Sequence, residues 1–404
     1  MKKLYSTSVL LSFPIVLTAQ NDCGSGRYIT PTFFDAVTTT SGIAFGSNVP
    51  VSGGGMQTLY MDIYEPEGDT VSTRPCVLVA FGGSFIGGSR ADVAPLCIAF
   101  AQLGYVAVAH DYRVGFFLPN AATTTQAVMR CSHDMLACVR YLHKSVIDDN
   151  NPYRIDPARI IVGGVSAGAI GALHVAYLDQ SSELPPVLYP DTATLGGISG
   201  NSGSPGYPEN VLACWSMSGA LGDTSWIQPG DEPLVSVHES GDEVVPCFTE
   251  MVEVIGFPTG LYASGGHDVH LRMENMGVEN CYLQYPGNGH VGYLNSDPEF
   301  SFAHVTDFLA EQVCNGNGNC GTIYAGVEET VEPELVAYPN PTEGPLNITV
   351  HERANVEVMD ATGRVVMTVQ PTVGLNVLDL SGLRNGLYTL RTGKAVVRVL
   401  KLAR

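Results

Sequence analysis

Basic residues are scarce in this 404-residue sequence, which has 20 Lys and Arg against 40 Asp and Glu. The net charge of −20 opposes every contact with a phosphate group, so the sequence predicts no nucleic-acid partner and no binding to anionic lipid. Zinc-type spacings are also missing, because the ten cysteines form no CxxC pair and no CxxC…HxxxH array. A zinc site therefore has little support.

Long hydrophobic runs are absent beyond the N-terminus. There, Lys2 and Lys3 precede an apolar stretch over residues 4–17, and the small residue Ala19 follows it. This order is typical of a secretory signal peptide, and the apolar stretch is too short to cross a bilayer. We therefore predict a signal peptide at residues 1–19 and no transmembrane segment in the mature chain.

The ten cysteines of a chain expected to be exported permit disulfides. Cys314 and Cys320 flank a short Asn-Gly loop, which a bridge between them would close. Cys131 and Cys138 lie seven apart on an expected helix, about 10 Å along its axis, which is too far for a bridge. The sequence leaves the connectivity open.

Short apolar runs alternate with helical periodicity through the middle of the chain. Residues 76–81, 105–109 and 160–162 read as buried strands, and residues 126–143 repeat apolar side chains at helical spacing. Buried strands that alternate with helices indicate an α/β fold with a mostly parallel sheet flanked by helices. A Pro- and Gly-rich insertion at residues 185–210 either faces substrate or is a solvated excursion.

The chain changes character near residue 314. A Gly/Asn stretch and an acidic spacer are followed by strand-like segments separated by turns, with eight Lys and Arg against six Asp and Glu from residue 333 on. We predict a catalytic α/β domain at 20–313, a linker at 314–332 and a small all-β sandwich domain at 333–404.

The segment Gly164-Val-Ser166-Ala-Gly168 lies between an apolar run and a helix-compatible stretch. A serine on a sharp strand-to-helix turn has its hydroxyl lifted clear of the sheet, and such a turn needs glycine on both sides. The motif alone is weak, but this context favours Ser166 as a nucleophile.

A second turn with the sequence FGGSF, at residues 81–85, follows an earlier strand. The backbone N–H groups of Gly83 and Ser84, with that of Ala167, are candidates to stabilise a developing oxyanion. The alternative is a tight turn without a catalytic role.

A serine nucleophile needs a base and an acid that orients the base. His290 lies on a Gly-flanked loop after a late strand, and His267 and His270 are the runners-up. Asp242 lies on a turn after another strand and is the candidate acid. Weaker candidates for the acid are Glu239, Glu243 and Asp268. Histidines expected to be structural or on the surface are His110, His133, His143 and His174.

Several of these pieces, in this order, resemble the α/β-hydrolase superfamily on its carboxylesterase and hormone-sensitive-lipase-like side. The resemblance covers residues 55–313. Its pieces are FGGSF, Asp111-Tyr-Arg113, Asp134, the DPARIIVGGVSAG segment, SGDEVVP and GNGH. One departure is Phe81, where relatives usually have His, so the support of the oxyanion turn is left open. The resemblance implies a serine esterase without metal or organic cofactor.

The tail resembles the C-terminal sorting domain of the Bacteroidetes type IX secretion system. The similarity rests on Tyr338-Pro-Asn-Pro341, VEVMDATGR, LSGL, NGLY and the basic end. It implies the secretion machinery as a partner, removal of the tail, and a secreted or cell-surface location. The alternative is a carbohydrate-binding β-module.

Together these patterns predict a secreted carboxyl-ester hydrolase that works through an acyl-enzyme. Ser166 is the expected nucleophile, His290 the base and Asp242 the orienting acid. The expected substrates are environmental esters, with polymers among the options. Two alternatives are a serine peptidase of the same superfamily and a non-catalytic surface binding protein on a hydrolase scaffold.

Overall fold

The computed structural model describes residues 23–115, 117–186, 196–254, 256–314, 318, 320–325, 335–350, 354–392 and 395–402. The expected signal peptide lies outside these residues. The chain divides into two compact units, Met1–Gly326 and Val327–Arg404, and each is described by itself. In the described part of the chain, no helix is both long and apolar enough to cross a membrane.

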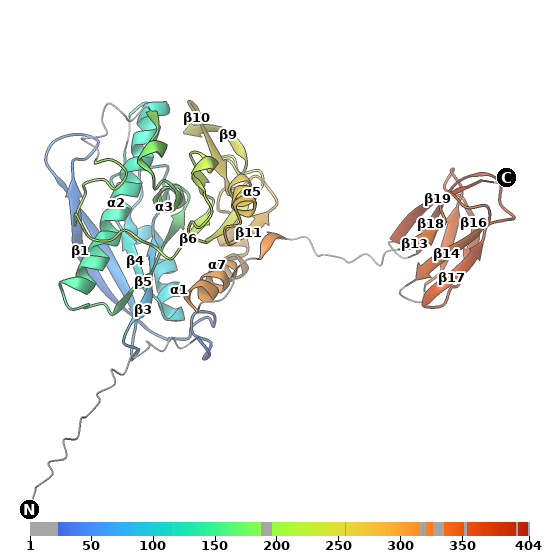
Figure 1. Cartoon of the computed structure of the whole chain (residues 1–404), viewed down its shortest axis with the longest axis horizontal. Coiled ribbons are helices and arrows are strands. Elements are labelled where there is room, and N and C mark those ends of the chain that lie inside the picture. The colour runs from blue at the N-terminus through green and yellow to red at the C-terminus, as the bar shows by residue number, and fades with distance from the viewer. Residues whose placement is uncertain are drawn as a thin grey trace, which may run out of the picture. The chain divides into compact units, whose positions relative to one another are not determined.

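The first unit is built on one large, mostly parallel sheet (Figure 1). In spatial order its strands are β1 (Val37–Asn48), β2 (Gln57–Pro66), β4 (Val106–His110), β3 (Arg74–Val79), β5 (Ile155–Val165), β6 (Ala213–Met217), β8 (Leu234–Glu239), β11 (Asn280–Tyr285) and β12 (Gly321–Tyr324). Strands β1 and β2 are antiparallel to their neighbours, and pairing is parallel from β4 onward. The expected α/β fold is therefore present.

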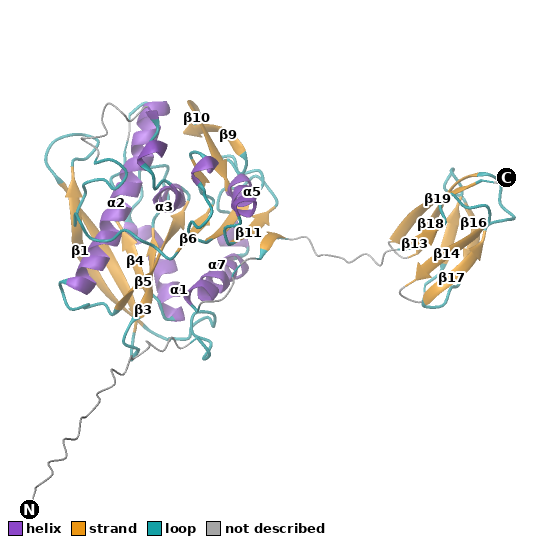
Figure 2. Ribbon diagram, in the orientation of Figure 1, coloured by secondary structure: helices purple, strands orange, loops and turns teal. Residues whose placement is uncertain are grey.

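Helices cover both faces of this sheet (Figure 2). They are α1 (Ala94–Leu103), α2 (Ala121–Ile147), α3 (Ala167–Tyr177), α5 (Gly266–Met276), α6 (Tyr293–Ser296) and α7 (Pro298–Val313). Side chains alternate along β3, so Val77 and Val79 join the core under α1 and α7 while Cys76 and Leu78 join the core under α2 and α3. Continuous apolar runs thus form strands buried on both faces.

A small sheet stands apart from the large one in the first unit. It pairs β7 (Ala220–Leu221), β10 (Phe257–Gly265) and β9 (Thr249–Val254), all antiparallel. Strands β9 and β10 form a hairpin inserted between β8 and α5. No strand pattern in the sequence indicated this hairpin.

The second unit is an antiparallel β sandwich with its own core. One sheet has β13 (Val336–Tyr338), β14 (Pro345–Val350) and β17 (Gly374–Asp379), and the other has β16 (Val365–Val369), β15 (Val356–Met359), β18 (Gly386–Thr392) and β19 (Ala395–Lys401). Leu346 and Ile348 from the first sheet pack with Val358 and Leu390 from the second. Alternating apolar side chains therefore close a core between the two sheets.

The disulfides differ from the bridge considered from the sequence. Cys314 pairs with Cys23 and Cys320 pairs with Cys281, so no Cys314–Cys320 bridge forms. Sequence proximity favoured the short loop, whereas the fold brings each cysteine beside a distant partner. The other six cysteines are free and buried.

The stretch expected as a linker, 314–332, contains a strand. Residues 321–324 form β12, which pairs in parallel with β11 at the edge of the large sheet. The Cys281–Cys320 bridge links these same two segments. Part of the expected linker therefore belongs to the first unit.

Candidate active site

Ser166 lies at the sharp turn between β5 and α3. Its backbone has φ 54° and ψ −121°, and its N–H donates to the Met217 carbonyl at 2.8 Å. A Cβ at Gly164 or Gly168 would lie 2.5 or 2.3 Å from the Ala80 carbonyl oxygen, so both positions require glycine. The packing of this turn against the end of β3 explains the GxSxG spacing.

A chain of two hydrogen bonds joins the three residues expected to act together. His290 Nε2 lies 2.8 Å from Ser166 Oγ, and His290 Nδ1 lies 2.7 Å from Asp242 Oδ2. Ser166 is 7% exposed and Asp242 8% exposed. The structure thus brings together groups separated by up to 124 positions in the sequence.

Asp242 is held by several donors. Burial raises the pKa of this carboxyl, but hydrogen bonds from His238, His290 and the backbone N–H groups of Val245 and Val244 outweigh burial and lower it. The two backbone N–H groups donate to Oδ1, which leaves Oδ2 facing His290. An ionised Asp242 accepts a hydrogen bond from the Nδ1–H of His290. The Nε2 of the neutral ring then carries no proton and is free to accept the hydrogen of the Ser166 hydroxyl.

His238, at the end of β8, is a site residue that the sequence analysis missed. Its Nδ1 accepts the Gly266 N–H at 3.1 Å, which requires the proton of the neutral ring to be on Nε2. That Nε2–H faces the Val245 carbonyl at 3.0 Å and Asp242 Oδ2 at 3.4 Å. The only sequence signal was its place on a buried strand, four positions before Asp242.

The competing histidines face other partners. His267 Nδ1 lies 2.8 Å from Asp268 Oδ1, and His270 contacts Asn280 and, at 2.7 Å, Thr322. Of the histidines expected to be structural, His133 and His174 have their pKa lowered by burial to about 4, so both are neutral at pH 7. His290 is the histidine that contacts Ser166 in the described part of the chain.

Two of the competing carboxylates hold the loop that carries His290. Glu239 Oε2 accepts the Gly292 N–H at 3.2 Å, and Glu243 accepts the Asn288 side-chain amide at 2.8 Å. The third, Asp268, accepts the Thr249 N–H at 2.8 Å. Each of these three carboxylates therefore binds a group other than the His290 ring.

The FGGSF turn lies directly beside Ser166. A Cβ at Gly82 would come within 3.2 Å of Ser166 Cβ. Positive φ angles follow in succession at Gly83 (124°), Ser84 (53°) and Phe85 (59°), a conformation that persists only where the surroundings enforce it. In the described residues, the backbone N–H groups of Gly83, Ser84 and Ala167 have no protein acceptor.

Tyr112 supports the FGGSF turn, in which Phe81 stands where relatives usually have His. Its ring stacks on Phe81 with centroids 4.1 Å apart, and its hydroxyl donates to the Phe81 carbonyl at 2.9 Å. Both residues are buried. An aromatic pair and a backbone hydrogen bond therefore hold the turn without a histidine at position 81.

Ser166 opens into a mostly apolar cavity of about 420 Å³. Ser84 and Ala167 line it together with Ser166, so two of the three candidate oxyanion donors share one space with the nucleophile. The first turns of α2 and the β9–β10 hairpin complete the lining. The arrangement matches the general form of a small-molecule site, with few polar groups in an apolar pocket.

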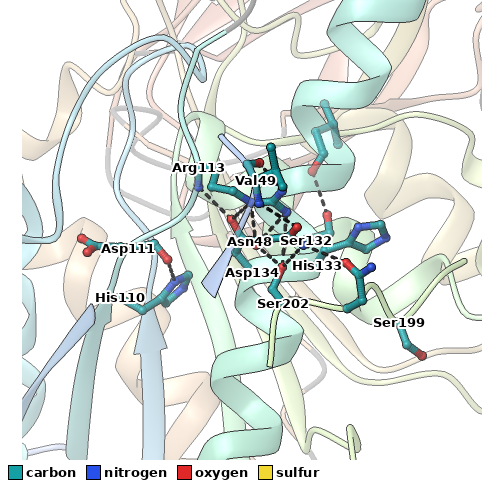
Figure 3. Close-up of polar contacts among 12 residues, drawn as sticks. Asn48, Val49, His110, Asp111, Arg113, Ser132, His133, Asp134, Ser199 and Ser202 are labelled. Carbon is teal, nitrogen blue, oxygen red and sulfur yellow. Dashed lines mark hydrogen bonds and ion pairs between the residues drawn. The ribbon is translucent and has the colours of Figure 1, made fainter. Parts of the chain in front are cut away.

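The described part of the 185–210 insertion is attached to α2. His133 Nε2–H donates to the Gly197 carbonyl at 2.9 Å, and Arg140 donates to the Gly203 carbonyl at 2.8 Å. Figure 3 shows Ser202 and Arg113 pointing toward Asp134, whose Oδ1 accepts from them at 2.5 and 2.9 Å. These contacts anchor the stretch to α2 and bury Ser202, while five of residues 201–210 are exposed.

Two prolines at the start of the insertion take a different position. Pro185 and Pro186 line the cavity, which is where the substrate-facing expectation placed the insertion. Residues 187–195 lie outside the described part.

One group of potential metal ligands occurs in the described part of the chain. Ligand atoms of Cys281, His304 and Cys320 lie within 4.8 Å of one another. The two cysteines are bonded to each other, so neither offers the thiolate that a zinc site uses.

Two family models match the chain. Residues 61–192 match BD-FAE, and residues 336–401 match the secretion system C-terminal sorting domain. Among curated proteins, the chain is 32% identical over 133 residues to the fumonisin B1 esterase of Sphingopyxis macrogoltabida. It is 33% identical over 129 residues to the non-reducing polyketide synthase pkbA of Emericella nidulans.

These alignments cover only parts of the proteins. They include 31% and 32% of this chain but 24% of the esterase and 5% of the synthase. Solved structures similar to the chain include esterase 2 of Thermogutta terrifontis phosphorylated by paraoxon and the same enzyme with butyrate bound. The identities are 21% and 20%; in both cases 66% of this chain and 94% of the other chain are covered and the TM-score is 0.46.

The matched segments agree with the two resemblances seen in the sequence, and both are confirmed. The sorting-domain match also confirms the expected export to a secreted or cell-surface location. The chain thus combines a segment similar to the BD-FAE family, at residues 61–192, with a segment similar to the secretion system C-terminal sorting domain, at residues 336–401.

Proposed function

We propose that the protein is a serine carboxylic ester hydrolase that works through an acyl-enzyme. The observation that carries the proposal is the hydrogen-bonded chain from Ser166 Oγ through His290 to Asp242 Oδ2. A fumonisin B1 esterase among the partial relatives supports ester chemistry.

In the proposed reaction, Ser166 Oγ attacks the ester carbonyl carbon while His290 Nε2 takes the hydroxyl proton. Collapse of the tetrahedral intermediate breaks the bond to the alcohol oxygen, which receives that proton from His290. Water then attacks the acyl-enzyme with His290 again as base, which releases the acid and restores Ser166. Asp242 keeps the Nδ1 proton in place and stabilises the imidazolium.

The oxyanion has three candidate donors in this proposal. Within the described residues the N–H groups of Gly83, Ser84 and Ala167 lack protein acceptors, and Ser84 and Ala167 line the same cavity as Ser166. Preorganised donors of this kind stabilise the charge that develops on the carbonyl oxygen, and removal of one typically costs about 10²–10³-fold in kcat.

We also propose a division of labour along the chain. Residues 1–19 act as the signal peptide, and residues 333–404 act as a transport address that takes no part in turnover. Ser166, Asp242 and His290 all belong to the first unit, and the second unit has its own core. The substrate is then an environmental ester, with acylated polymers among the candidates.

A paired substrate panel tests the proposal. Purified protein, Ser166→Ala and the control Glu311→Gln, which changes an exposed side chain on α7, are assayed on p-nitrophenyl esters and on p-nitroanilides of the same acyl groups. We expect ester turnover that Ser166→Ala abolishes and Glu311→Gln retains. Faster cleavage of the anilides would replace the proposal with a peptidase, and no turnover of either set would favour a binding protein.

A further inference from the structure

The cavity beside Ser166 has a one-sided charge. Its walls are formed largely by apolar side chains, including Val128, Ile170, Trp226 and Leu261. Three carboxylates also line it, and they are Glu183, Asp223 and Glu253. No Lys or Arg lines it within the described part of the chain.

The sequence explains this imbalance. From residue 160 to residue 271 the chain contains thirteen Asp and Glu residues and no Lys or Arg. This block supplies most of the cavity-lining residues, including those on α3 and on the β9–β10 hairpin.

The three carboxylates are not neutralised by ion pairs in the described part of the chain. Glu183 Oε2 accepts the N–H groups of Asp179 and Gln180, and Asp223 Oδ1 accepts the Ser225 N–H. Glu253 lies on the exposed side of β9. Backbone donors orient two of these charges without cancelling them.

Arg130, on the neighbouring helix α2, and Arg113, in the segment before it, bind groups outside the cavity lining. On α2, which contributes to the cavity wall, Arg130 donates to the Gly115 carbonyl at 2.9 Å and does not line the cavity. Arg113 pairs with Asp134 at 2.9 Å. An anionic group in the cavity would therefore meet like charge and no compensating donor with a positive charge.

We infer that the cavity selects uncharged ester substrates and rejects esters that carry a carboxylate. This inference rests on the proposed function and specifies the substrate class of the same site. The apolar walls bind the uncharged chain by desolvation, while Glu183, Asp223 and Glu253 repel a negative group. The same repulsion favours departure of the product acid once it ionises.

Two esters of nearly equal size test the inference. Mono-p-nitrophenyl adipate carries a carboxylate at neutral pH, and methyl p-nitrophenyl adipate does not. Nitrophenolate release is followed at low ionic strength, with Ser166→Ala as the background. We expect kcat/KM to be at least tenfold higher for the methyl ester. The ratio should shrink in about 0.5 M salt, because salt screens charges on a partly open cavity.

Variants locate the source of the discrimination. The single variants Glu253→Gln and Asp223→Asn should raise kcat/KM for the carboxylate ester, and their combination with Glu183→Gln should raise it further. The kcat/KM for the methyl ester should change less. Glu311→Gln removes the same charge from α7, whose residues do not line the cavity, and should leave the ratio unchanged. Equal turnover of the two esters, with no response to salt or to the three substitutions, would overturn the inference.

Failure of the hydrolase proposal gives a different result. In that case neither ester is cleaved in a Ser166-dependent manner. The cavity is then tested by calorimetric binding of both esters to Ser166→Ala, where the methyl ester must bind more tightly. Equal or weaker binding of the methyl ester would reject the charge selection by itself.

Discussion

A pair of substitutions at His238 tests how Asp242 is held. The two ring nitrogens have separate tasks, since Nδ1 accepts the Gly266 N–H and Nε2 donates toward Asp242 Oδ2 at 3.4 Å. In His238→Gln the amide nitrogen lies near the former Nε2, so a donor to Asp242 remains. In His238→Asn the amide lies near the former Nδ1, so the contact with Gly266 is kept and the donor to Asp242 is lost.

The expected size of the effect follows from the geometry. A hydrogen bond to a charged group contributes about 1.5–3 kcal/mol. The His238 proton is shared with the Val245 carbonyl at 3.0 Å, which places its bond to Asp242 near the low end. We therefore expect His238→Asn to lower kcat/KM by about tenfold, equivalent to ~1.4 kcal/mol, and His238→Gln to retain most activity.

The pH profile separates positioning from simple loss of packing. Without the His238 donor, the Asp242 carboxylate is less stabilised by hydrogen bonds and stabilises a protonated His290 more strongly. The acid limb of kcat/KM should therefore move to higher pH in His238→Asn and stay in place in His238→Gln. Equal losses in both variants, with unmoved limbs, would refute the reasoning, and unfolding midpoints measured in urea control for stability.

Three further outcomes follow from burial and topology. Burial lowers the pKa of His133, His174 and His304 to about 4, so the unfolded state binds more protons between pH 6.5 and 4. The free energy of unfolding that these histidines contribute is fully present above pH 6.5 and should fall by ~1.4 kcal/mol per histidine per pH unit as the pH drops. His304→Gln should make the urea unfolding midpoint depend less on pH. Midpoints of the unsubstituted protein that do not change with pH would contradict this. Truncation after Gly326 should leave kcat/KM unchanged on a soluble ester and on a polymer. Truncation after Val313 removes β12 and Cys314 and should lower the melting temperature. A selective loss of activity on the polymer after the first truncation would make the tail a substrate-binding module. Cys314→Ser removes the bridge that closes a loop of 291 positions, and it should lower the free energy of unfolding by about 2–5 kcal/mol in denaturant titrations. Under reducing conditions the substitution should have no effect. An unchanged unfolding midpoint in oxidising buffer would show that the bridge is not formed.

Much of the fold was readable from local pattern. The apolar runs became β3, β4 and β5 because each is short, continuous and followed by a turn. Leu59, Met61 and Ile63 alternate in the sequence of β2 and are all fully buried. The runs in β3, β4 and β5 are continuous because both faces of each of these strands contact the core.

Features with distant partners were not readable in the same way. The four bridged cysteines pair across 291 and 39 positions, and β12 joins the sheet through β11. Nothing local marks these contacts, since each depends on where the whole fold places the second partner. The β9–β10 hairpin was missed because its strands are mostly exposed and lack a continuous apolar run.

The site shows the same division. Ser166, Asp242 and His290 each lie on a turn after a strand, and parallel strands bring such turns to one edge of the sheet. His238 lies inside a strand and looks like an ordinary core residue until its two nitrogens are followed to Gly266 and Asp242. A role that depends on a tautomer requires the three-dimensional partners.

Covalent labelling tests the central claim most directly. The protein is treated with diethyl p-nitrophenyl phosphate, and the adduct is located by intact and peptide mass spectrometry. A serine activated by His290 should take up one diethylphosphoryl group on Ser166, with loss of ester turnover in proportion. Labelling should vanish in Ser166→Ala and slow strongly in His290→Ala. An adduct on another residue, or full ester turnover in Ser166→Ala, would contradict the account.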